Sequence, residues 1–372
     1  MDLGRHINQL RDMLGPEALL TAEADIASYE QGARLERGRA AFVLRPRSTE
    51  EVSEAVGYCV RHDIPIVPQA GNTGVVAAST PDSSGVQAIL SIDRINKRFE
   101  LDVCNRSVRC DAGLRLSQVN ARLAGAGLQF PIDLGADPML GGMLATNTGG
   151  SRFLRFGDVR RNVLGIKVVL ADENGTVLDL MSPLRKNNTS VDWKHVFIGT
   201  SGAFGIITEC EINLEFVPGQ AATALLVPRD GNAVMPLLAA MERRLGSYLS
   251  AFEGMSRNAV QATVAHVPSL RNPFQSNAAP DYAILCEVTR SWEAREGEQS
   301  LDEVLENALA EIWSADEPLL SDALVAPAVE LWALRHALPE GVRHVGKLVA
   351  FDLSFRRQDV FAFCDRMKEQ LP

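Results

Sequence analysis

The stretch PQAGNTG, residues 68–74, ends an apolar run in a turn of small residues. The run IPIVPQ at 64–69 predicts a strand, and Gly71 and Gly74 give the following turn backbone angles that are closed to other residues. Successive N–H groups in such a turn can point into one concavity that binds phosphate oxygens without a positive side chain. The turn is therefore a candidate phosphate-binding loop.

The sequence around this turn alternates between predicted strands and helices. Strands are expected at 40–46, 64–69, 88–93 and 107–113. Ser48 and Glu51 form a predicted capping box that starts a helix, and a second helix is centred on Val119. Asn174-Gly175 predicts a type I′ turn in a β-hairpin over 163–180.

Two more glycine-rich loops follow, DLGADPMLGGMLATNTGG at 133–150 and GTSGAFGIIT at 199–208. One such loop alone does no more than turn the chain in about half of cases, because single motifs have many false positives. Three of them favour a bound cofactor. The G-x-G-x-x-G pattern between a strand and a helix is absent, and so is G-x-x-x-x-G-K-[ST], which disfavours NAD and ATP.

Dense glycine usage stops near Pro218-Gly219, where we place a domain boundary. Beyond it, the periodicity predicts the following elements. Helices are expected near 231–245, 298–313, 326–336 and 357–371, with strands at 282–289 and 347–355.

Composition narrows the choice of partners. The 372 residues include 37 basic and 47 acidic side chains, a net charge of −10, which disfavours nucleic acid. The charged N-terminal stretch MDLGRHINQLRDML is typical of neither a signal peptide nor a membrane span, so we expect a cytoplasmic protein. The six cysteines show no C-x-x-C spacing and are expected to be reduced and mostly buried.

The motifs resemble those of the FAD-linked oxidases of the vanillyl-alcohol oxidase type, in the branch of D-lactate, glycolate and D-2-hydroxyglutarate dehydrogenases. PQAGNTGVVAAS (68–79) is similar to that branch's pyrophosphate loop, and PIDLGADPMLGGMLATNTGG (131–150) is similar to its isoalloxazine-side loop. RFGDVRRNVLGIKVVLADENGTVLDL (155–180) and FIGTSGAFGIIT (197–208) follow in the family's order, so the resemblance covers roughly 40–215.

The resemblance implies an α+β fold, with a two-subdomain FAD-binding domain over 1–218 (core 40–215) and an α+β substrate or cap domain over 219–372. It implies non-covalent FAD, because the pyrophosphate loop carries Asn72 and no histidine lies in 131–150. The implied cofactor-binding residues are Pro68, Gln69, Ala70, Gly71, Asn72, Thr73, Gly74, Val75, Pro131, Leu134, Gly135, Gly141, Gly142, Ala145, Thr146, Asn147, Gly149, Gly150, Gly157, Ile206 and Ile207.

The catalytic candidates lie in LWALRHALPEGVRHVGKLVAFDLSF (331–355), which resembles the family's W-x-L-R helix and the strand after it. Arg335 matches the carboxylate-binding arginine, a role that suits a planar guanidinium. Many relatives have a lysine where this chain has Ala350, and Lys347 can replace it only if a bulge turns the strand. Without the resemblance, both are ordinary surface cations.

The resemblance implies FAD-dependent oxidation of a small 2-hydroxy acid, of D configuration, by hydride transfer to flavin N5, with electrons passed to an unknown acceptor. The family's His-Gly-x-Gly-Asp-Gly-x-x-His stretch and its later Glu-His pair are absent before Pro372. We therefore expect no metal site and weak or no turnover by these residues alone. The alternatives are an FAD-binding fragment or subunit without independent activity, and an enzyme acting on an unrelated alcohol or sugar. The acidic composition is compatible with a homodimer.

Overall fold

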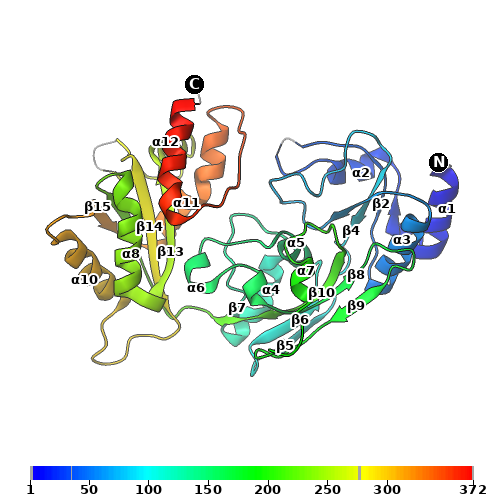
Figure 1. Ribbon diagram of the computed structural model, residues 1–372, viewed down its shortest axis with the longest axis horizontal. Helices are drawn as coiled ribbons and strands as arrows, with labels where there is room; N and C mark the ends of the chain where they lie inside the picture. Colours follow the sequence, from blue (N-terminus) through cyan, green and yellow to red (C-terminus); the bar gives the residue numbers. More distant parts are fainter. Residues whose placement is uncertain (1–2, 35, 275–277, 371–372) are drawn as a thin grey trace. The chain divides into compact units, whose positions relative to one another are not determined.

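The computed structural model describes residues 3–34, 36–274 and 278–370. The chain divides into two compact units (Figure 1). The first contains residues up to 150 and 157–217, and the second contains 151–156 and the chain from 218 onward. The six residues 151–156 therefore pack with the second unit, although they lie within the range 1–218 that was expected to form the FAD-binding domain.

The first unit contains two main sheets. The four-stranded sheet has the order β1-β2-β4-β3, in which β2, β4 and β3 are parallel, and the five-stranded sheet has the antiparallel order β5-β6-β10-β8-β9. A small pair joins β11 to β7. The strands are β1 (Leu19–Leu20), β2 (Ala40–Leu44), β3 (Ile66–Gln69), β4 (Gln87–Ser91), β5 (Phe99–Asp102), β6 (Ser107–Asp111), β7 (Leu128–Gln129), β8 (Val163–Val169), β9 (Val177–Leu180), β10 (Ile206–Asn213) and β11 (Glu215–Phe216).

Helices cover these sheets and bury one large apolar core and a smaller separate cluster of Ile26, Val43, Val67 and Ile89. The helices of the first unit are α1 (Leu3–Leu14), α2 (Glu23–Glu30), α3 (Thr49–Arg61), α4 (Leu116–Leu123), α5 (Leu140–Thr146) and α7 (Lys194–Phe197). Ser48 caps α3, because its hydroxyl accepts from the Glu51 N–H at 3.3 Å. The Glu51 carboxylate accepts from the Arg47 N–H instead, so only half of the expected capping box forms.

The hairpin of β8 and β9 is present, but its turn differs from the expected type I′. A type I′ turn requires positive φ at both central residues, whereas only Gly175 has one, at 59°. The Asp172 carboxylate instead accepts from the N–H groups of Asn174 and Thr176 at 3.0 and 2.9 Å. Aspartate favours such local hydrogen bonds in turns, and here they stabilise a loop that is longer than a two-residue type I′ turn.

The second unit is built on one antiparallel sheet in the order β13-β14-β12-β15. Its strands are β12 (Gln220–Pro228), β13 (Leu249–Ser256), β14 (Tyr282–Arg290) and β15 (Leu320–Val325), and its helices are α6 (Phe153–Phe156), α8 (Val234–Leu245), α9 (Arg257–His266), α10 (Leu301–Trp313), α11 (Ala328–Arg343) and α12 (Val360–Gln370). Figure 1 shows α8 and α10 together on one side of this sheet. Both units mix helices with sheets, so the expected α+β fold is confirmed.

Both faces of this sheet are buried, and alternate residues of β14 divide between them. Ile284 and Cys286 pack with α8 and α10, whereas Ala283 and Leu285 pack with α9 and α11. The strand therefore reads as a continuous apolar run, as expected for a strand covered on both sides.

The strand expected at 347–355 does not form. These residues pair with no described strand, and the side chains of Val349, Phe351 and Leu353 are exposed. Alternating apolar residues make a strand only where a partner strand supplies the hydrogen bonds of a ladder. Among the described residues, no helix is both long and apolar enough to cross a membrane.

Candidate functional site

The first glycine-rich loop leaves the end of β3 and is held from behind by side chains. Gln69 is buried, and its amide nitrogen donates to the carbonyls of Tyr29 and Ser79 at 2.9 and 2.8 Å. The Asn72 amide donates to the Gln31 carbonyl at 2.7 Å, and its oxygen accepts from the Ser79 hydroxyl at 2.9 Å. These side chains shape the loop, so a ligand meets mainly its backbone.

The backbone N–H groups of residues 71–75 are the chemically available part of this loop. Within the described chain they donate no hydrogen bond to protein acceptors. Neither Gly71 nor Gly74 has the left-handed φ expected of it; the positive φ angles belong to Asn72, at 51°, and to Ala77 beyond the loop, at 59°. Backbone N–H groups are strong donors that rarely stay unpaired, and a row of them in such a turn binds anions. The residues present therefore fit a phosphate-bearing cofactor.

The second loop packs directly against the first. A β-carbon on Gly71 would lie 3.1 Å from the Met139 backbone nitrogen, and one on Gly142 would lie 3.2 Å from the Ala70 β-carbon. Gly141 lies deeper, where a β-carbon would come within 2.5 Å of the Ile92 side chain. The two loops can approach this closely only because these positions lack side chains.

The third loop joins the same cluster. The Ser201 N–H donates to the Ala145 carbonyl at 2.7 Å, and the Gly199 N–H donates to the Leu144 carbonyl at 3.1 Å. A β-carbon on Gly202 would lie 3.1 Å from the ring of Pro68. All three loops, far apart in the sequence, thus converge within the first unit.

Most of the other expected cofactor residues lie within these loops. Asn147 ends α5 with φ of 50°, and its side chain bonds Asp158 and the Arg160 N–H, both at 2.9 Å. Gly149 pairs with Asp158, and a β-carbon on Gly150 would lie 2.7 Å from the Asp133 nitrogen. Thr73, Gly74, Val75, Leu134, Gly135, Ala145 and Thr146 keep exposed or half-buried surface, whereas Pro131, Gly157, Ile206 and Ile207 are buried.

Three supporting residues are not predicted by the sequence motifs. Gln31 and Ser79 anchor the first loop, and Asp158 anchors the end of α5. Ser79 and Asp158 lie inside the quoted motifs, but nothing in the sequence shows which polar group they bind. Gln31 lies outside every motif.

Arg335 lies on α11 in the second unit. Its Nε and Nη2 both lie near one oxygen of Glu253 on β13, at 2.9 and 2.7 Å from Oε2. The side chain is 29% exposed. The neighbours Leu331, Trp332 and Leu334 are buried, which fixes the helix on its sheet. Arg335 is thus neither free nor fully solvated.

Lys347 lies on the exposed segment 345–355, and it makes no hydrogen bond or ion pair within the described residues. Because no regular strand forms there, the alternation that was expected to point Lys347 to the opposite face from Ala350 does not apply. The structure does not bring Lys347 into contact with Arg335.

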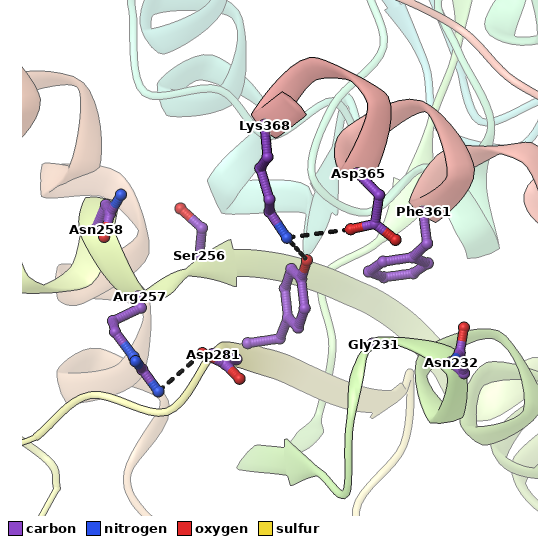
Figure 2. A pocket seen from close by; sticks show the side chains of 10 residues that line it. Gly231, Asn232, Ser256, Arg257, Asn258, Asp281, Phe361, Asp365 and Lys368 are labelled. Carbon is purple, nitrogen blue, oxygen red and sulfur yellow. Dashed lines mark hydrogen bonds and ion pairs between the residues drawn. The ribbon is translucent and has the colours of Figure 1, made fainter. Parts of the chain in front are cut away.

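A separate pocket of about 390 Å³ opens in the second unit (Figure 2). Lys368 on α12 donates to the Tyr282 hydroxyl and pairs with Asp365, each at 3.2 Å, and Arg257 pairs with Asp281 at 2.8 Å. None of the residues expected to bind cofactor or substrate lines it. Both of its cations are already neutralised by carboxylates.

The described residues contain no group of three or more His, Cys, Asp or Glu side chains placed to hold a metal ion. His6 lies near Tyr58 and His62, and His266 stacks on His344 at 5.4 Å between ring centres. The six cysteines are free, with Cys59, Cys110, Cys210 and Cys286 buried, as the sequence predicts for most of them.

Comparison with known proteins supports the cofactor assignment. Residues 40–181 match a family described as an FAD binding domain. The range spans the first two glycine loops, and the unpaired N–H groups of the first loop fit the FAD pyrophosphate. Residues 40–181 therefore form an FAD-binding domain.

Relatives extend the match along the chain. A probable mitochondrial D-2-hydroxyglutarate dehydrogenase of Oryza sativa subsp. indica is 34% identical over 341 residues, which are 90% of this chain and 59% of that protein. The D-2-hydroxyglutarate–pyruvate transhydrogenase of Saccharomyces cerevisiae is 30% identical over 370 residues, covering 97% of this chain and 72% of the relative. The chain thus spans 59% of the length of the rice relative.

A solved structure of alkyldihydroxyacetonephosphate synthase superposes with a TM-score of 0.72 at 18% identity, covering 92% of this chain and 65% of that one. At this identity the likeness concerns the fold alone. Together with the glycine loops and the curated relatives, it leads to one conclusion: the chain belongs to the FAD-linked oxidases of the vanillyl-alcohol oxidase type, in the branch of the D-2-hydroxyglutarate and D-lactate dehydrogenases.

Proposed function

We propose that this chain holds FAD non-covalently and oxidises a small 2-hydroxy acid of D configuration, passing the electrons to an acceptor that is not identified. The proposal takes its substrate class from relatives whose names specify D-2-hydroxyglutarate and D-lactate. The part of the proposal that concerns FAD binding rests on the residues of this chain.

One observation carries the proposal: the unpaired backbone N–H groups of 71–75, packed beside the second and third loops. A dinucleotide cofactor needs its pyrophosphate charge compensated, and here backbone dipoles can do this without a lysine or arginine. The Asn72 side chain bonds Gln31 and Ser79, and its amide offers no nucleophile for a covalent bond to the flavin, in keeping with non-covalent attachment.

On the substrate side, Arg335 would hold the carboxylate of the acid, because a guanidinium can meet a carboxylate through two parallel hydrogen bonds. When bound, FAD would supply the two-electron acceptor, at flavin N5, for the hydride of the hydroxyl-bearing carbon, while the hydroxyl proton passes to a general base and the 2-oxo acid is formed. The protein's task is then to fix the acid in one orientation and to hold the cofactor's phosphates.

The test is an anaerobic titration of the FAD-loaded protein with D-lactate, D-malate and D-2-hydroxyglutarate, followed through the flavin absorption bands. Bleaching by one of these acids supports the reaction class, and Arg335→Met should retain bound FAD while requiring far more acid. A protein that binds no FAD after purification in its presence would refute the proposal at its first step.

A second function is favoured by one observation, the exposed and unpaired segment 345–355 with Lys347 on it. If a further polypeptide covers this segment, the chain is an FAD-binding subunit without independent activity. Flavin that binds but stays oxidised with every D-2-hydroxy acid would support this alternative.

A further inference from the structure

Arg335 and Glu253 meet in an asymmetric way. The Nε and Nη2 atoms of the arginine lie 2.9 and 2.7 Å from the same carboxylate oxygen, Oε2 of Glu253. A guanidinium is planar and carries five N–H donors on two usable edges. Glu253 therefore takes the side edge of the group, formed by Nε and Nη2.

The other edge of the guanidinium remains available. Nη1 has no partner within the described residues, and the side chain is 29% exposed. The end edge, formed by Nη1 and Nη2, has the spacing that accepts both oxygens of a carboxylate in parallel hydrogen bonds. One arginine can thus bind Glu253 and a carboxylic acid at the same time, on different edges.

Both partners are mounted on rigid elements. Glu253 lies in β13, opposite Leu285 of β14 in the sheet register. One turn before Arg335 on α11, Trp332 is buried, and its indole N–H donates to Glu287 of β14 at 2.8 Å. The sheet therefore fixes both the carboxylate of Glu253 and the helix that carries Arg335.

We propose that Glu253 is a positioning residue for Arg335: it occupies the side edge of the guanidinium and directs the end edge toward the carboxylate of the 2-hydroxy acid. The inference rests on the proposed function, since it assumes that Arg335 binds the acid. Glu253 acts through Arg335 and does not itself contact the acid.

This division of edges distinguishes arginine from lysine. A lysine ammonium is a compact point charge without a second edge, so Glu253 would compete with the acid for it. Removing the Glu253 charge should therefore strengthen acid binding only when position 335 is a lysine. If the ion pair only stabilises the fold, removal of the Glu253 charge should act on acid binding in the same direction whether position 335 is arginine or lysine.

The experiment uses the full FAD-loaded chain and oxalate, a dicarboxylate without a hydrogen to transfer, so that binding is measured by calorimetry without turnover. The variants are Arg335→Met, Arg335→Lys, Glu253→Gln and the double variant of the last two, with Glu253→Ala as a second removal of the charge. Retained flavin absorption and an unchanged thermal midpoint show that each variant is folded.

We expect Arg335→Met to abolish oxalate binding, and Glu253→Gln alone to leave the affinity unchanged or weaken it by up to about 10-fold, the cost of ordering a free arginine. In the Arg335→Lys background, Glu253→Gln should instead strengthen oxalate binding, by roughly 3-fold or more. Weakening in both backgrounds would make the pair merely structural, and strengthening in both would make Glu253 a simple repulsive charge, so either result overturns the inference. If Arg335→Met binds oxalate normally, the proposed role of Arg335 fails first.

Discussion

Arg152 and Glu287 form a two-point ion pair in the second unit, although 135 residues separate them in the sequence. Nε of Arg152 lies 2.7 Å from Oε1 of Glu287, and Nη2 lies 2.9 Å from Oε2. The Glu287 side chain is only 2% exposed and also accepts from Ser250 and Trp332. Burial would raise the pKa of this carboxyl, but the hydrogen bonds and charge of Arg152, with those two donors, lower it below its ordinary value.

Arg152→Met should destabilise the second unit by about 3 kcal/mol. The expected loss is at the low end of the range for breaking a buried pair, because the Arg152 side chain is 27% exposed. Urea unfolding followed by tryptophan fluorescence measures it. Arg356→Met, which breaks the exposed pair with Asp359, is the control and should cost no more than about 1 kcal/mol. Equal losses in the two variants would contradict the role of burial.

The same pair predicts a pH dependence. In the unaltered chain the folded pKa of Glu287 is lowered, so its contribution is complete above the unfolded pKa and is lost as the pH falls through the lowered folded value. In Arg152→Met, burial is no longer compensated and raises the folded pKa of Glu287 above its unfolded pKa. The variant should therefore regain stability as the pH falls from the folded pKa toward the unfolded pKa, because the buried carboxyl becomes protonated. The difference in unfolding free energy between the two proteins should therefore shrink from pH 7 to pH 5. Adding Glu287→Gln to the variant should abolish this trend.

Gly74→Val should weaken FAD binding while leaving the protein as stable as before. No atom lies within 4 Å of a β-carbon at this position, so the valine points into open space beside the unpaired N–H groups. We expect at least a 10-fold loss of FAD affinity, measured by quenching of flavin fluorescence. Gly125→Val, at another open and exposed position, should leave FAD affinity unchanged. Normal FAD binding by Gly74→Val would remove the first loop from the cofactor site.

Gly141→Ala tests the packing of the second loop. Its new methyl group would come within 2.5 Å of Ile92 and 3.0 Å of Ala112, both buried, so we expect a loss of about 1–3 kcal/mol in unfolding free energy. Gly135→Ala in the same loop meets nothing within 4 Å and should stay within about 0.5 kcal/mol. Chemical denaturation of the two variants compares them directly, and a stable Gly141→Ala would show that the helix shifts without cost.

The thiols should differ sharply in reactivity. Cys110 and Cys210 face each other across β6 and β10, with their sulfur atoms 3.8 Å apart, and their mutual hydrogen bond together with burial raises the pKa of Cys110. Burial likewise raises the pKa of Cys59 to about 12. A disulfide-exchange reagent should therefore modify Cys104 and Cys364 in the folded protein and the rest only after unfolding. Rapid modification of Cys110 in the folded protein would contradict the buried pair.

The sequence predicted best those features that depend on local patterns. The strand, turn and small residues at 64–74 are enough to predict the loop after β3, and the apolar spacing of α3 is enough to predict its buried face. The segment 347–355 has an equally regular pattern, yet a strand also needs a partner, and partners are not encoded locally.

The contacts that shape the candidate sites were not predictable for the same reason. Gln31 holds Asn72, and Glu253 holds Arg335, across 41 and 82 residues of sequence. Which polar groups meet depends on sheet register and on how helices pack, so a motif can identify a loop without identifying what fixes its shape. The expected roles of Arg335, Lys347 and the loop residues stay predictions.

The six residues 151–156 contact the second unit as a separate bound peptide would, although they belong to the same chain. Besides Arg152, they contribute Leu154 to the apolar core and Arg155, which donates to the carbonyl and hydroxyl of Thr289. A fragment produced from residue 218 onward would lack all three and would contain Glu287 without its counter-ion. A synthetic peptide of residues 151–156, added in trans, should restore the stability of such a fragment. The second unit is therefore assembled from two non-contiguous pieces of chain.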